Sequence, residues 1–390
     1  MVRRGRELIQ LPGPTNIPAR VLRAMHRQVV DFAAPEFTVM ARSCLDELRD
    51  VFKTRGEVYG YASIGHGTWE AALANLVAPG AGILLPETGM FSLRWREMAE
   101  RLEIPVEEIP SDWRHALDPA AVEARLRADR ERRIGAVCVV QVETSTGIRH
   151  DVAAVRRAID AAGHPALLVV DAIASLATVD LEMDGWGCDL VLAASQKGLM
   201  LPPGMAFVAV GERAQRAAEA NPRPRAYWDW RSRQGSYSYM WFHGTPPVQM
   251  MFGLRESLDM LFEEGLVAVL ARHTRLATAA RAAVAHWSGA GALEFQAVEP
   301  ACRADAVTAI RFRDGIDADA LRLLCRDRLG VAFGGGLGPL GGKVLRIGHL
   351  GDLNEPMLLG ALAVLETGLE LQGIPYQPGG VTAAIGALAS

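Results

Sequence analysis

Short apolar runs alternate with helical periods between residues 60 and 211. Each run is three to six residues long, and the segments between them, such as 119–132 and 152–162, repeat apolar side chains at the spacing of an amphipathic helix. This alternation is typical of a mainly parallel sheet that lies between helices. The strands predicted in this part of the chain are 82–85, 106–109, 135–140, 166–170, 190–192 and 205–210.

The pattern changes around Gly289. Two long helical periods precede this glycine, and alternating polar and apolar residues after it indicate antiparallel strands. The helices predicted here are 248–264, 266–287 and 318–329, and the strands are 307–312 and 344–347. We therefore expect an α/β fold with a large, mainly parallel sheet between helices, followed by a smaller α+β domain.

Three parts are predicted along the chain. Residues 1–25 form an N-terminal segment that lines the site, residues 26–275 form a large cofactor-binding domain, and residues 276–390 form the small C-terminal domain. With 390 residues, the chain is long enough for this arrangement. Its tail, residues 376–390, is rich in Gly and Ala and is predicted to be poorly ordered.

Composition and charge narrow the classes of function. Half of the residues are hydrophobic, and the net charge of -4 gives no reason to expect a nucleic acid or a membrane as partner. The five cysteines lack the spacing of metal ligands, so no metal site is predicted. Residues 1–7 lack the apolar run of a signal peptide, and no stretch reaches the length of a membrane span. We therefore expect a cytoplasmic protein.

Lys197 stands where an apolar strand gives way to a loop. A lysine at the end of the buried run 190–193 costs free energy unless it has a partner. Its amine can snorkel to solvent, which is the simpler interpretation of Lys197 taken alone. Covalent use as a Schiff base with an aldehyde cofactor is the functional alternative.

Asp171 ends the apolar run 167–170, which predicts a central parallel strand. Such a strand delivers the carboxylate to the carboxyl edge of the sheet, where open α/β sheets bind ligands. An aspartate there can also cap the next helix. Together, however, Asp171 and Lys197 are the two groups that pyridoxal phosphate needs. The carboxylate keeps the pyridine nitrogen protonated, and the amine forms the Schiff base.

Residues 63–70 carry two glycines and hydroxyls before a predicted helix. Unpaired backbone amides and the helix dipole make such a helix start an anion site, here for the cofactor phosphate. His66 can hydrogen-bond the phosphate or lie over the ring, and a plain capping role is the alternative.

Other side chains offer contacts to a flat cofactor and its substrate. Phe91, at a strand-to-helix junction, can stack on the ring, although an aromatic there is more often part of the core. One of the three hydroxyls in 144–146 can bond the phenolic oxygen. Arg346, between apolar neighbours in a strand, suits a bidentate carboxylate from a substrate or from a protein acid. The rigid segment 12–18 can line a pocket.

Seven short motifs occur in the order found in a known family. They are 11–15, 63–70, 143–147, 170–171, 195–197, 245–247 and 346–351. Together they resemble the class V (fold type I) pyridoxal-phosphate aminotransferases, and most of all the serine–glyoxylate and alanine–glyoxylate group. The resemblance spans nearly the whole chain.

The resemblance implies roles around the cofactor ring. Lys197 would be the Schiff-base and proton-transfer lysine, and Asp171 would hold the pyridine nitrogen. Ile173 would lie against the ring, Phe91 would stack on its opposite face, and Ser145 would lie near the phenolic oxygen.

The resemblance also implies contacts to the phosphate and the substrate. The phosphate-side positions are Gly65, His66, Gly67 and Gln196. Arg346 would hold the substrate carboxylate, with Pro14 lining the substrate side. Thr245 matches a residue that reaches the phosphate of the neighbouring subunit, so a homodimer with shared sites is expected.

The implied reaction moves an amino group from a small amino acid, serine or alanine, to glyoxylate or a similar small 2-oxo acid. Aspartate or a non-amino-acid amine is the alternative donor. Aspartate is less favoured because Arg346 is the single clear clamp for a carboxylate. A lyase of the cysteine-desulfurase kind would need a reactive cysteine on a mobile loop, which Cys325 in its helical stretch does not offer. A catalytically idle binding fold is the rival from another class, and the intact pair of Asp171 and Lys197 argues against it.

Two departures from the family pattern stand out. Phe32 and Ala33 follow Asp31 where serine–glyoxylate enzymes carry a Tyr-Arg pair. Phe242 stands where some relatives place a phosphate-binding tyrosine, and it has no hydroxyl to offer.

Overall fold

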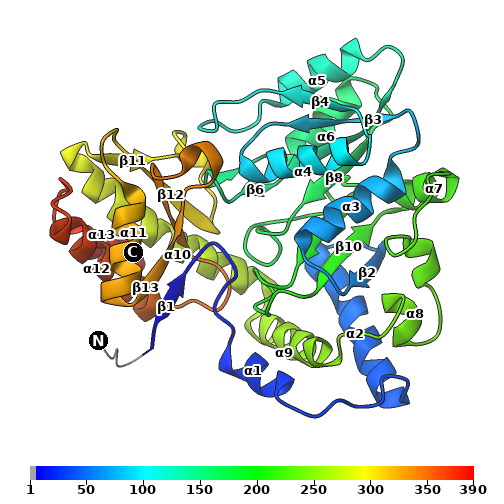
Figure 1. The fold of residues 1–390 in the computed structure, drawn as a ribbon, viewed down its shortest axis with the longest axis horizontal. Coiled ribbons are helices and arrows are strands. Elements are labelled where there is room, and N and C mark those ends of the chain that lie inside the picture. The colour runs from blue at the N-terminus through cyan, green and yellow to red at the C-terminus, as the bar shows by residue number, and fades with distance from the viewer. Residues whose placement is uncertain (1–5) are drawn as a thin grey trace.

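Two sheets organise the molecule (Figure 1). The structure, a computed structural model, describes residues 6–390. A seven-stranded sheet has the order β2-β10-β9-β8-β5-β3-β4. Its strands are β2 (Glu57–Tyr61), β3 (Gly82–Pro86), β4 (Val106–Ile109), β5 (Ile134–Val140), β8 (Leu167–Asp171), β9 (Leu190–Ala194) and β10 (Ala206–Val210).

The large sheet is mainly parallel, as predicted. Strands β4, β3, β5, β8 and β9 pair in parallel, whereas β10 runs antiparallel to both β9 and β2. Because the parallel strands share a direction, the residues that follow them gather at one edge of the sheet. Asp171 is the last residue of β8, and Lys197 comes three residues after β9 ends at Ala194.

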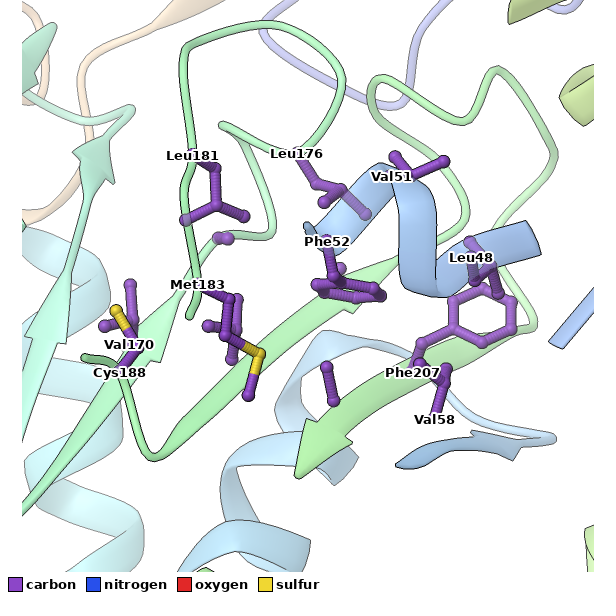
Figure 2. Close-up of a cluster of buried hydrophobic side chains, with 14 of the residues drawn as sticks. Leu48, Val51, Phe52, Val58, Val170, Leu176, Leu181, Met183, Cys188 and Phe207 are labelled. Atoms are coloured by element: carbon purple, nitrogen blue, oxygen red, sulfur yellow. The ribbon is translucent and has the colours of Figure 1, made fainter. Parts of the chain in front are cut away.

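Helices cover both faces of the large sheet because its strands are apolar on both sides. Successive side chains point to opposite faces, so Val170 and Val191 join one core and Val169 and Leu192 join the other. The first core, part of which Figure 2 shows, lies under α2 (Pro35–Phe52), α5 (Pro119–Ala128), α6 (Val152–Ala161) and α9 (Val248–Glu264). The second lies under α3 (Gly65–Leu76), α4 (Met90–Arg101) and α7 (Glu212–Ala220).

A five-stranded sheet forms the other lobe, with the order β1-β13-β14-β12-β11. Its strands are β1 (Leu8–Gln10), β11 (Leu293–Phe295), β12 (Val307–Phe312), β13 (Val331–Gly335) and β14 (Val344–Gly348). Strand β1 pairs in parallel with β13, so the start of the chain joins the C-terminal lobe, as Figure 1 shows in blue beside orange. The helices of this lobe are α10 (Leu266–Trp287), α11 (Ala318–Leu329), α12 (Glu355–Leu371) and α13 (Gly380–Ala389).

The remaining elements are short. They are the helices α1 (Ala19–Met25) and α8 (Ser238–Phe242), the hairpin of β6 (Val142–Glu143) and β7 (Ile148–Arg149), and the 3-10 turns η1 (Trp230–Arg233), η2 (Ser288–Ala290), η3 (Pro300–Cys302) and η4 (Gly338–Leu340).

The prediction of a poorly ordered tail is wrong. Residues Gly380–Ala389 form α13, which packs along α10 with Ala384 fully buried. The small residues that suggested flexibility instead allow two helices to approach closely. The helix predicted over 119–132 also ends earlier, at Ala128, because Asp129 accepts hydrogen bonds from the backbone of Arg133 and Ile134.

Other predictions about the chain as a whole are tested only in part. None of the helices formed by the described residues combines the length and apolar character needed to cross a membrane. Residues 1–5 lie outside the described residues. They are part of the predicted N-terminal segment 1–25 and of residues 1–7, which were predicted not to form a signal peptide. The boundary between domains at residue 275 stays a prediction.

Candidate active site

A cavity of about 210 Å³ opens at the carboxyl edge of the large sheet. Its walls come from distant parts of the chain: the N-terminal segment, the start of α3 and α4, and the ends of β5, β8 and β9. Eight residues predicted from sequence line it, namely Pro14, Gly65, His66, Phe91, Asp171, Ile173, Gln196 and Lys197. Trp69, Val140, Val142, Thr144, Ala174, Gly13 and Pro203 complete the lining.

Lys197 is a buried amine with a lowered pKa. Burial, and secondarily the positive charge of Arg346, lower the pKa of Lys197 to about 8. Its Nζ donates a hydrogen bond to the carbonyl of Pro12. Gly13 is left-handed at φ +113°, and a Cβ there would lie 2.5 Å from Cδ and Cε of the lysine. The N-terminal segment therefore closes over Lys197, and only glycine lets it come so near.

Asp171 is held by two donors at the end of β8. The Trp69 indole Nε1 donates to its Oδ2 over 2.7 Å, and the backbone N–H of Ile173 donates to its Oδ1 over 2.7 Å. Burial raises the pKa of Asp171 to about 7, against the opposing effect of these two hydrogen bonds. Trp69 was not among the residues predicted from sequence, because an indole in a helix gives no sign of an acceptor 102 positions away.

The predicted phosphate seat lies at the first turn of α3. Its N-cap, Ile64, offers no side-chain cap. The N–H of Gly67 donates to the Ile64 carbonyl over 2.9 Å, so the amides of Gly65 and His66 are the ones that can face an anion. A Cβ at Gly65 would meet the Ile173 side chain, and one at Gly67 would lie 2.6 Å from the Trp228 ring. Gly67 itself does not line the cavity, although it stands in the same turn.

Ser145 is occupied by contacts within the protein. Its Oγ donates to Glu143 Oε1 over 2.6 Å and accepts from the backbone of Met90 over 2.9 Å. The other oxygen of Glu143 accepts from the N–H of Phe91 over 3.1 Å. The buried Glu143, which sequence reasoning missed, therefore fixes the start of α4 and with it Phe91. Its neighbour Thr144 lines the cavity, whereas the bond from Ser145 to a phenolic oxygen stays a prediction.

Arg346 lies in β14, next to the cavity rather than in its lining. Its Nε donates to the carbonyl of Gly335 over 2.7 Å and its Nη1 to that of Thr144 over 3.1 Å. Burial lowers the pKa of Arg346 to about 10. Within the described chain no carboxylate lies at ion-pair distance from this guanidinium, so the alternative of an internal salt bridge finds no partner. A substrate carboxylate can supply the missing anion.

Thr245 lies away from the cavity of its own chain. It is exposed in the segment between α8 and α9. Phe242, three residues earlier, is buried in the core and is only 3.2 Å from where a Cβ of Gly60 would lie. Phe32 stacks at 6.2 Å on Tyr239, also outside the cavity. Thr245 thus does not reach a phosphate in the same chain.

The cavity fits pyridoxal phosphate on its own features. Oε1 of Gln196 is buried at the cavity and finds no hydrogen-bond partner among the described residues, as expected for a group that a ligand satisfies. Apolar Ile173 and aromatic Phe91 line it together with the carboxylate of Asp171 and the amine of Lys197. This set suits a flat heterocycle with a nitrogen at one end and an aldehyde beside the lysine.

Comparisons with known proteins agree with this geometry. The model of the family "Aminotransferase class-V" matches residues 11–338. The chain is similar to the serine–glyoxylate aminotransferase of Methylorubrum extorquens, at 42% identity over 98% of this chain and 96% of the relative. It is also similar to the L-aspartate–glyoxylate aminotransferase of Paracoccus denitrificans, at 40% identity over 96% of this chain and 94% of that one. Among solved structures, the ureidoglycine–glyoxylate aminotransferase of Bacillus subtilis superposes with a TM-score of 0.90 at 28% identity, covering 100% of both chains.

Proposed function

The chain belongs to the class V aminotransferases, which are pyridoxal-phosphate enzymes, and from this premise we propose that it transfers the amino group of serine or alanine to glyoxylate. The observation that carries the proposal is the meeting of Lys197 and Asp171 at one cavity, with Arg346 unpaired beside it. Asp171 would bind the cofactor ring, Lys197 would bind its aldehyde, and Arg346 would bind the carboxylate of the substrate.

Each residue has a defined task in this reaction. When bound, pyridoxal phosphate supplies an aldehyde that takes up the amino group and a protonated ring that accepts an electron pair. Lys197 would hold the cofactor through its amine, and once a substrate amine has taken its place, its Nζ would move the proton at the substrate alpha carbon. A lysine with a pKa of about 8 is partly neutral near neutral pH and can accept that proton. Asp171 would balance the positive charge of the ring nitrogen.

The choice of a small donor rests on the charges of the cavity. Among the lining residues of the described chain, Lys197 is the sole lysine or arginine, and burial lowers the pKa of the lining His66. Arg346 can bind one carboxylate, and a second carboxylate, as in aspartate, would meet no further cation in this chain. The apolar lining from Val140, Val142 and Pro14 suits a short side chain.

Kinetics with a panel of donors test this function. We expect serine or alanine with glyoxylate to give a kcat/KM at least about tenfold above that of aspartate, a difference of ~1.4 kcal/mol. Arg346→Ala should raise the KM for these donors by roughly ten- to a hundredfold, the loss of about 1.5–3 kcal/mol of charged hydrogen bonding. Arg346→Lys keeps the positive charge but loses the two parallel donors of the guanidinium, so its KM should lie between that of the wild type and that of Arg346→Ala. A faster reaction with aspartate, or with a non-amino-acid amine, would refute the proposed donor.

We further propose a homodimer in which each subunit completes its partner's site through Thr245. The exposure of Thr245 outside its own cavity supports this arrangement. We also propose a cytoplasmic location, which the five buried free cysteines support, because thiols stay reduced there.

A further inference from the structure

Trp69 makes a contact that the reaction described above does not use. It lies one turn into α3, it is 1% exposed, and its indole Nε1 donates to Oδ2 of Asp171 over 2.7 Å. The second oxygen of Asp171 accepts from the N–H of Ile173 over 2.7 Å. Each carboxylate oxygen thus receives one hydrogen bond from the protein and keeps a lone pair for a ligand.

We propose that Trp69 is a positioning residue that orients the Asp171 carboxylate toward the ring nitrogen of the cofactor and keeps it ionised. The inference goes beyond the proposed substrates, because it holds for any amino donor. It also gives α3 a second role. The first turn of this helix would bind the phosphate through Gly65 and His66, and Trp69, one turn later, would act at the ring nitrogen.

The indole is itself held in one orientation. Its ring stacks on Trp95 with a centroid distance of 5.8 Å and an angle of 14°, and it meets Phe91 edge-on at 6.4 Å. The ring of His66 also lies close, with a centroid distance of 4.4 Å. A donor fixed in this way loses little further conformational entropy when it orients a carboxylate.

A neutral donor suits this position. Asp171 is buried, and burial raises its pKa, whereas the hydrogen bond from Trp69 lowers it. The charged groups that act on Asp171 are Glu143, which favours protonation, and Lys197, which opposes it. Lys197 must be neutral before it can act as a base and is charged only after it has accepted the proton, so its help is intermittent. An indole N–H donates at every pH and adds no charge that could compete with the ring nitrogen.

The rival explanation is that Trp69 only packs in the core. The neighbouring Trp95 allows a packing role to be distinguished from a positioning role. Trp95 is fully buried and belongs to the same stack, yet its Nε1 has no partner among the described residues. Replacing either tryptophan by phenylalanine removes similar ring area from one cluster. Only the change at position 69 removes a hydrogen bond to Asp171.

The test compares four variants: Trp69→Phe, Trp95→Phe, Asp171→Asn and the double change at 69 and 171. For each, the dissociation constant of pyridoxal phosphate is measured by titrating the cofactor-free protein, and the visible absorbance of the bound cofactor is followed against pH. We expect Trp69→Phe to weaken cofactor binding by about tenfold or more, as for the loss of a charged hydrogen bond. It should also shift the pH midpoint of the absorbance upward, because a less positive ring draws less electron density from the nitrogen on its aldehyde carbon.

Trp95→Phe loosens the stack on Trp69 but keeps the hydrogen bond from Trp69 to Asp171, so it should change the dissociation constant by less than about threefold and leave the midpoint in place. In the Asp171→Asn background, Trp69→Phe should add little further loss, because its effect passes through the carboxylate. An equal loss of affinity in both backgrounds, or an unmoved midpoint in Trp69→Phe, would overturn the proposal. If Trp69→Phe does not fold, replacement of Trp69 by benzothienylalanine keeps the shape of the ring, removes the N–H and is read by the same two measurements.

Discussion

At the residue scale, Lys197 shows what a buried charge costs the fold. Its pKa falls from 10.5 to about 8 because burial disfavours the charged amine. This difference corresponds to about 3 kcal/mol. Below pH 8 the lysine is charged in both the folded and the unfolded state, so the full cost is present. Between about pH 8 and 10.5 the unfolded chain binds more protons, and stability rises with pH.

Lys197→Met should therefore stabilise the cofactor-free protein at pH 7 by about 3 kcal/mol. The advantage over the wild type should shrink as the pH rises from 8 to 10.5, because the wild-type amine loses its charge in that window. Urea unfolding of both proteins at pH 7 and at pH 10 measures the change. An advantage that is the same at both values would show that the buried charge is not its source.

Gly13→Ala should damage the site through steric contact with the lysine. The new Cβ would lie 2.5 Å from Cδ and Cε of Lys197, and φ at this residue is +113°. We expect loss of most cofactor binding and activity. Gly80 is the matched control, since its φ of +83° is also left-handed but nothing lies within 4 Å. Gly80→Ala should cost about 1–2 kcal/mol of stability and leave turnover intact, which thermal unfolding and an activity assay will show.

The sequence predicts functional residues well where they stand at the end of a strand. Lys197 and Asp171 follow apolar runs, and the rule that ligands bind at the carboxyl edge of a sheet suffices to bring them together. Trp69 and Glu143 lacked such a signal. Their roles depend on partners 102 and 52 positions away, and an indole or a buried carboxylate carries no local mark of such a partner.

At the element scale, the first turn of α3 needs a glycine at position 67, because its backbone packs closely against the side chains of Ser63 and Trp228. Gly67→Ala would place a Cβ against Ser63 Oγ and 2.6 Å from the Trp228 ring, so the turn must shift. We expect the dissociation constant of pyridoxal phosphate to rise by about tenfold, or ~1.4 kcal/mol. The control is Gly360→Ala within α12, where the nearest atom is 3.9 Å away. That change should stabilise the protein by about 0.5–1 kcal/mol without altering cofactor affinity.

Long periodic elements were the easiest to predict. The helices Val248–Glu264, Leu266–Trp287 and Ala318–Leu329 begin and end where their apolar periods do. Helix α13 was missed because its small residues carry no strong period, and its order comes from packing on α10. Tertiary contact, rather than local propensity, decides such a segment.

At the scale of the whole molecule, the N-terminal segment joins the C-terminal lobe. Strand β1 adds to the C-terminal sheet in parallel with β13, and the segment after it runs over Lys197 with the Thr15 hydroxyl on the Lys197 carbonyl at 3.1 Å. A local pattern of three residues could not predict a partner more than 300 positions away. The C-terminal lobe is thus tied to the cavity both through Arg346 and through the N-terminal segment.

The proposed sharing of sites between two subunits makes a quantitative prediction about mixed dimers. Thr245→Asp would set a carboxylate against the cofactor phosphate in the partner subunit. Lys197→Ala would remove the amine that the proposed reaction needs. Each variant alone should therefore have little activity. In a mixed dimer, the Lys197→Ala subunit supplies an intact Thr245 to the other subunit, whose Lys197 is also intact. After unfolding and refolding an equal mixture, half of the dimers are mixed and half of their sites are complete, so about a quarter of wild-type activity should return. Thr367→Asp, on an exposed face of α12, should remain active alone and serves as the control for the added charge. No recovery on mixing would show that Thr245 serves no site in the partner subunit.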